Sequence, residues 1–196
     1  MLIPDAVHPS WDRFLSSEIR EELADIEKKI GENFNPVNRN NILRFLTVDL
    51  DRVLIIWLGQ DVYPAKGVAT GRSFEVGTIQ NWDDSFRQVS LKNIIRLIHK
   101  NYNGFEDYKE IKPFKDIQKE IRSGKFPVKQ PKEWFNSLEE QGVLFLNSSF
   151  TCEIGNANSH KKIWESFSNK LLKFISVQRP DIIWFLWGNE AIANKE

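Results

Sequence analysis

The sequence predicts an α/β protein, a three-layer α/β/α sandwich around a small, mostly parallel central sheet. Three apolar runs of strand length, at 53–58, 142–147 and 181–187, are typical of parallel strands buried on both faces. Segments with helical periodicity alternate with these runs, as expected where helices connect parallel strands. The length of 196 residues and the apolar fraction of 41% suit a single domain, residues 1–196, with one hydrophobic core.

The N-terminal part of the chain is expected to be helical. Apolar residues recur at helical spacing from Leu15 to Ile30. Because Ser10 is a plausible N-cap, we predict a helix over residues 11–30. A shorter helix over residues 40–46 is expected just before the first strand.

The region between the first and third strands should hold two further helices. Residues 77–88 lack periodicity and indicate a loop, after which Ser90 is expected to cap a helix over residues 90–103. Residues 105–131 are charged and interrupted by prolines, and they predict a surface excursion rather than a second domain. The periodic segment 159–176 predicts a helix between the second and third strands.

Charge and composition limit the classes of function and compartment. Lys+Arg and Asp+Glu both number 27, so a DNA-binding role would need the positive charge clustered on one face. No apolar run approaches the roughly 20 residues of a membrane span, and the N-terminus does not resemble a signal peptide. Cys152 is the only cysteine, which excludes an internal disulfide. These features predict an intracellular, cytoplasmic protein without membrane association.

The strongest site signal follows the first strand, where Gly59-Gln60-Asp61 and Tyr63 end the apolar run. Ligand sites in parallel sheets lie just beyond the carboxyl ends of the strands. Asn147 ends the second apolar run. Taken alone, Asp61 also suits a turn or a helix cap, and Asn147 suits a turn.

Six ordered patterns carry a resemblance to the uracil-DNA glycosylase family across nearly the whole chain. They are Arg52–Asp61 with Tyr63, Gly67–Val76, Ser90–Ile94, Trp134 with Gln141–Asn147, Ala157–His160 with Trp164, and Leu186–Gly188 with Ala191. The resemblance implies the fold predicted above and a DNA glycosylase that hydrolyses the base–sugar bond of a flipped-out uracil or related pyrimidine.

The resemblance also implies a role for each site residue. Asp61 would stabilise positive charge on the sugar and orient the attacking water. Phe74 would stack on the flipped base, and Asn147 would bind its Watson–Crick edge through an amide that both donates and accepts. Tyr63 would exclude a methyl group at the pyrimidine C5 position. Gln60 would contribute backbone contacts to the base.

Outside the base pocket, Ser90 would meet a DNA phosphate near a helix N-terminus. The reaction requires no cofactor and no metal, and the expected partner is DNA, single- or double-stranded. Two alternatives stay open. One is a glycosylase that acts on a modified base of viral or phage DNA, and the other is a catalytically weak homologue that binds DNA or a protein partner.

The sequence departs from the family pattern at several places. The family's catalytic His-Pro-Ser-Pro-Leu loop, which follows a fourth strand, is not found before Glu196. Two explanations stay open: the sequence is a fragment of a longer, complete enzyme, or it is a naturally short member that binds but catalyses weakly. The His-Pro-Ser tripeptide at 8–10 precedes the first helix and is interpreted as structural. Val62 and Pro64 replace a family Pro and His, and Arg72 stands where the family usually has Leu. An uncovered third strand predicts partner binding or self-association.

Overall fold

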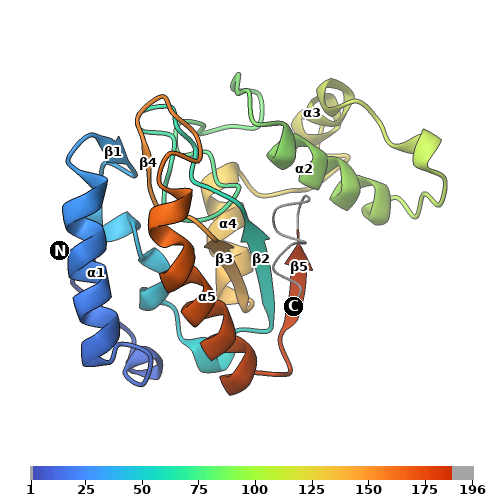
Figure 1. Ribbon diagram of the computed structural model, residues 1–196. Coiled ribbons are helices and arrows are strands. Elements are labelled where there is room, and N and C mark those ends of the chain that lie inside the picture. Colours follow the sequence, from blue (N-terminus) through green and yellow to red (C-terminus); the bar gives the residue numbers. More distant parts are fainter. Residues whose placement is uncertain (1, 187–196) are drawn as a thin grey trace. The chain divides into compact units, whose positions relative to one another are not determined.

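A computed structural model describes residues 2–186 (Figure 1). The chain forms two compact units. Unit 1 contains the residues up to Ser73 and those from Leu138 onward, and unit 2 is Phe74–Ser137. Each unit has its own buried apolar side chains and is described separately below. The predicted motif residues Trp187, Gly188 and Ala191 lie outside the described residues.

Unit 1 is built on a three-stranded parallel sheet. Its strands are β2 (Ile55–Gly59), β3 (Val143–Asn147) and β5 (Ile183–Leu186), in the spatial order β3-β2-β5. All three predicted strands are found, each starting within two residues of the predicted position, and the predicted end of the third strand, Trp187, lies outside the described residues. The central strand is therefore the one that the site motif follows, and Gly59 pairs in register with Asn147.

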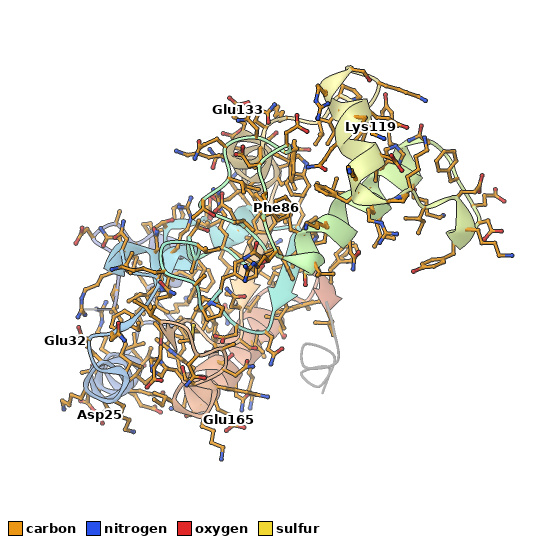
Figure 2. The ribbon with its side chains drawn as sticks, turned by 90° about the horizontal axis from the view of Figure 1, so that it is seen from above. Asp25, Glu32, Phe86, Lys119, Glu133 and Glu165 are labelled. Carbon is orange, nitrogen blue, oxygen red and sulfur yellow. The ribbon has the colours of Figure 1, made fainter. Side chains whose placement is uncertain are left out.

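Two helices, α1 (Ser17–Ile30) and α5 (Lys161–Gln178), lie side by side in unit 1 (Figure 1). They bury their apolar faces against the sheet, while charged side chains such as Asp25 and Glu165 lie on the exposed faces (Figure 2). The shared core includes Ile19, Leu23, Ile26, Ile56, Leu58, Leu144, Leu146, Phe167 and Leu171.

The predicted first helix, 11–30, begins later than its periodicity suggested. Pro9–Trp11 is a single 3-10 turn, and α1 starts after Ser16, whose Oγ accepts the Ile19 N–H at 3.3 Å. Ser10 lies within this 3-10 turn rather than at the start of α1, and its Oγ accepts the backbone N–H of Leu50 at 3.0 Å. The side chain of Ser10 therefore ties the N-terminus to the approach to β2.

The predicted helix over 40–46 is also replaced by tighter turns. A two-stranded antiparallel sheet, β1 (Phe34–Asn35) with β4 (Cys152–Glu153), was not predicted, because strands of two residues carry no periodicity. Unit 1 then runs to β2 through 3-10 turns at Arg39–Asn41, Arg44–Thr47 and Leu50–Arg52.

Unit 2 is helical. It holds α2 (Val89–Tyr102), α3 (Phe114–Arg122) and a 3-10 turn at Tyr108–Glu110, and α4 (Pro131–Glu140) begins within it. The charged excursion 105–131 thus contains a helix that the sequence analysis missed. The buried side chains of this unit include Trp82, Leu91, Ile94, Ile95, Ile117, Phe126 and Phe135.

The N-terminus of α2 differs from the prediction. Gln88, rather than Ser90, is the N-cap, because the Gln88 carbonyl already accepts the Lys92 N–H at 3.4 Å. Ser90 therefore lies inside the first turn of α2, where it is exposed to solvent.

Between residues 2 and 186, every helix is too short or too polar to cross a bilayer. The same part of the chain contains no group of three or more His, Cys, Asp or Glu side chains placed to hold a metal ion.

Candidate active site

The candidate site forms where β2 and β3 end side by side. The Gly59 carbonyl accepts the Ser148 N–H at 3.0 Å, and the Gln60 carbonyl accepts the Ser149 N–H at 3.0 Å. The parallel pairing thus continues past both strands and holds the two loops together. Asn147, the last residue of β3, is only 3% exposed at this edge.

Asp61 holds its carboxyl group in an asymmetric environment. Oδ2 accepts the backbone N–H of Asn158 at 2.5 Å. Oδ1 is buried and makes no hydrogen bond within the part of the chain that the structure describes. Burial raises the pKa of Asp61, and the hydrogen-bonding groups of Asn158, Ser149 and Val62 offset this only in part. One oxygen is therefore fixed, and the other needs a hydrogen-bond donor that the described chain does not supply.

Asn158 is a site residue to which the sequence analysis gave no role. Its backbone is left-handed, with a φ of 62°, a conformation that asparagine tolerates better than most residues. In this conformation its N–H reaches Asp61 and its Oδ1 accepts the side chain of Gln60 at 2.9 Å. The Ala-Asn-Ser-His pattern contained this residue, but its contact with Asp61 depends on the tertiary structure.

Tyr63 lies in a loop that Asn35 holds in place. The Asn35 amide, which is fully buried, donates to the carbonyls of Tyr63, Pro64 and Ala65 at 3.3, 2.8 and 3.1 Å. Burial raises the pKa of the Tyr63 phenol, so this ring is neutral at physiological pH. The sequence offered no signal for Asn35, which is remote from the motif along the chain.

Phe74 and Ser90 belong to unit 2. Phe74 has a φ of 65°, a left-handed backbone that costs a non-glycine residue about 1–2 kcal/mol. Strained residues of this kind are typical of functional sites. Ser90 is exposed in the first turn of α2. The structure thus brings Gln60, Asp61, Tyr63 and Asn147 together in unit 1.

The buried histidine near the site, His160, has the contacts of a packing residue. Its Nδ1 lies 2.9 Å from Thr151 Oγ1, which also accepts the Trp164 indole N–H at 2.7 Å. Burial lowers the pKa of His160. Burial also raises the pKa of the Cys152 thiol to about 12, which leaves the thiol protonated and unreactive at neutral pH.

Comparison with known proteins finds sequence relatives that are named uracil-DNA glycosylases. The uracil-DNA glycosylase of Borrelia duttonii is 33% identical over 203 residues, covering 97% of this chain and 77% of that protein. Uracil-DNA glycosylase 1 of Listeria innocua is 30% identical over 190 residues, covering 93% of this chain and 73% of that protein. No protein-family model matches the chain.

Solved structures share the fold at lower sequence identity. The uracil-DNA glycosylase of Nitratifractor salsuginis superposes with a TM-score of 0.71 at 23% identity, covering 96% of this chain and 77% of that chain. The mimivirus uracil-DNA glycosylase gives a TM-score of 0.67 at 19% identity, and this chain spans 63% of its length. These matches confirm the predicted α/β fold with a small, mostly parallel sheet.

Proposed function

This chain belongs to the uracil-DNA glycosylase family, and we propose that it hydrolyses the N-glycosidic bond between uracil and deoxyribose in DNA. Water adds to the C1′ carbon, the base–sugar bond breaks, and the products are free uracil and an abasic site. In the proposed reaction water is the only co-substrate, and the scheme uses no cofactor and no metal. A DNA substrate would place the activity inside the cell.

The observation that carries the proposal is the carboxyl group of Asp61. It lies just beyond the central strand, with Oδ2 fixed by the Asn158 N–H and Oδ1 buried without a partner in the described chain. A carboxylate held in this way can accept a hydrogen bond from an attacking water. Its negative charge also stabilises the positive charge that develops on the sugar in the transition state.

The other site residues would recognise the base. The Asn147 amide, buried at the end of β3, offers a donor and an acceptor to the edge of uracil. Tyr63, in the loop held by Asn35, would exclude a methyl group at C5 and so discriminate against thymine. Gln60 would contact the base through its backbone. Phe74 would stack on the base.

DNA itself would be bound outside this pocket. In unit 2, Ser90 is exposed in the first turn of α2, where backbone N–H groups lack helical partners. A phosphate of the substrate strand would bind there. This contact would position the strand without reading its sequence.

The test is single-turnover release of uracil from a single-stranded oligonucleotide that carries one uracil. Wild-type protein should release the base, and Asp61→Asn should slow release by roughly 10²–10⁴-fold while still binding the oligonucleotide. A thymine oligonucleotide serves as the substrate control. Equal rates for wild type and Asp61→Asn, or no release by a folded wild-type protein, would refute the proposal and favour a modified base or a binding role.

The edge of the sheet supports a second, separate proposal about partners. Ile183 and Phe185 of β5 are 59% and 44% exposed, and within residues 2–186 the outer edge of β5 pairs with no strand. We propose that a second copy of the chain associates along this edge. A monomeric sedimentation profile at micromolar concentration would contradict it.

A further inference from the structure

Three consecutive residues of unit 1 are held in place immediately before Phe74. Gly71 has a φ of 88°, and a Cβ at this position would lie 2.0 Å from the Asn41 carbonyl oxygen, so the two backbones are in close contact. Arg72 forms an ion pair with Glu139. The Ser73 hydroxyl donates to the Trp57 carbonyl of β2 at 2.9 Å. The backbone that leads into Phe74 is therefore fixed at each step.

The Arg72–Glu139 pair is the strongest of these contacts. Arg72 Nε and Nη2 donate to the two carboxylate oxygens of Glu139 at 2.8 and 2.7 Å, which is bidentate geometry. The Arg72 side chain is 4% exposed and that of Glu139 is 21% exposed. Arg44 lies 3.5 Å from the same carboxylate. Burial alone would raise the pKa of Glu139, but the two arginines hold it below its ordinary value, so the pair is fully charged.

A buried ion pair of this kind is a poor source of stability. Removing two charges from water costs about as much as their attraction returns, and apolar side chains of similar volume often serve a core equally well. The pair instead fixes orientation, because a planar guanidinium bound at two points restricts how the backbone of Arg72 can be oriented. The residue that follows this fixed segment is Phe74, whose φ of 65° persists only where the surroundings over-determine it.

We propose that the Arg72–Glu139 ion pair is a positioning clamp that holds Phe74 in its left-handed conformation, ready to stack on the substrate base. The proposal rests on the function proposed above, because it concerns the ring that would stack on uracil. Arg72 and Glu139 do not touch the substrate in this scheme. They act through Phe74, by orienting its backbone before the substrate arrives.

The test is a double-mutant cycle on uracil release. Four proteins are compared: wild type, the apolar pair variant Arg72→Leu/Glu139→Leu, Phe74→Ala, and the combination of all three changes. The pair variant should lose about 10²-fold in single-turnover rate, the cost of a misplacement of roughly 1 Å. In the Phe74→Ala background the same change should cost less than about 3-fold, since the clamp then has no ring to position.

Two additional variants sharpen the result. Arg72→Lys keeps the charge but loses the two-point contact, so its rate should lie between those of wild type and the pair variant. The matched control is Arg122→Leu/Asp83→Leu, which removes a bidentate pair of the same chemistry whose side chains are 65% and 46% exposed. The control should release uracil at the wild-type rate.

Backbone amide exchange gives a readout that does not depend on activity. In the pair variant, exchange at Ser73, Phe74 and Val76 should accelerate while exchange in β2 stays unchanged. Equal losses in both Phe74 backgrounds, or a pair variant with wild-type rate and exchange, would overturn the clamp. If wild type released no uracil, the proposed function would fail, and the exchange experiment would still decide whether the ion pair fixes Phe74.

Discussion

The loop after β2 in unit 1 and the α2–α3 helix pair in unit 2 each contain a hydrogen-bonded carboxylate. The two carboxylates differ in whether a basic side chain is bound to them. In the loop, Asp61 receives a backbone N–H, and no cation pairs with it within residues 2–186. In the helix pair, Glu120 lies 2.7 Å from Nε2 of the buried His99 and also binds Lys112. The pKa of Asp61 is raised, chiefly by burial, whereas that of Glu120 is lowered to about 2, chiefly by its hydrogen bond with Lys112.

This difference separates a reactive carboxylate from a structural one. A carboxylate that is satisfied by cations has no capacity left for a substrate, and it stabilises the fold by joining the elements that carry its partners. A carboxylate that is buried without a cation destabilises the fold slightly and keeps an oxygen available for chemistry. The contrast yields three predictions, in order of decreasing effect.

The pH profile of uracil release should show the largest effect. Asp61 must be ionised to act, and its raised pKa means that protonation begins at a higher pH than for an ordinary aspartate, whose pKa is 3.8. The single-turnover rate should therefore fall about tenfold per pH unit below the pKa of Asp61. Release that stayed constant down to pH 4, in a protein still folded by circular dichroism, would place the catalytic group elsewhere.

Removal of the structural carboxylate should reduce stability. Glu120→Gln leaves His99 without its anionic partner, and we expect unit 2 to lose about 1–3 kcal/mol in urea denaturation at pH 7. Because the pKa of Glu120 is lowered from 4.5 to about 2 in the folded state, its contribution is complete above pH 4.5 and is lost as the pH falls towards 2. The exposed residue Glu106 offers a control, since Glu106→Gln should change little.

Removal of the Asp61 carboxylate should not reduce the free energy of unfolding, in contrast to removal of the Glu120 carboxylate. Asp61→Asn replaces an unpaired buried acid with a neutral side chain that still accepts the Asn158 N–H. The free energy of unfolding at pH 7 should stay constant or rise by up to about 1 kcal/mol, although uracil release falls. A clear loss of stability in this variant would mean that Asp61 is structural, as Glu120 is.

The sequence predicted the sheet better than the helix boundaries. Continuous apolar runs locate β2, β3 and β5 because burial on both faces leaves no room for polar residues. A site past the end of β2 was expected from the strand pattern. Asn147 was assigned to that site only through the family resemblance, and the structure pairs it in register with Gly59 of β2. Helix starts were less predictable, since Ser10 and Ser90 have the chemistry of caps while their neighbours decide whether a helix begins there.

The supporting residues of the site could not be predicted. Asn35 holds the Tyr63 loop and Asn158 holds Asp61, but each is distant in sequence from the group that it supports. The Arg72–Glu139 pair likewise joins two segments whose relation depends on the complete fold. Sequence patterns report local periodicity and family motifs, whereas these contacts arise only when remote segments have come together.

The order β3-β2-β5 has a consequence for how the chain reaches this fold. Ile55 of the central strand pairs with Val143 on one side and with Ile183 on the other, so β2 is synthesised long before either neighbour. During synthesis its apolar side chains remain without partners, and such long-range parallel pairing is slow because extended loops must close first. We therefore expect the nascent chain to need chaperone protection until β5 has been made. Unit 2, with its local helical contacts, can form earlier.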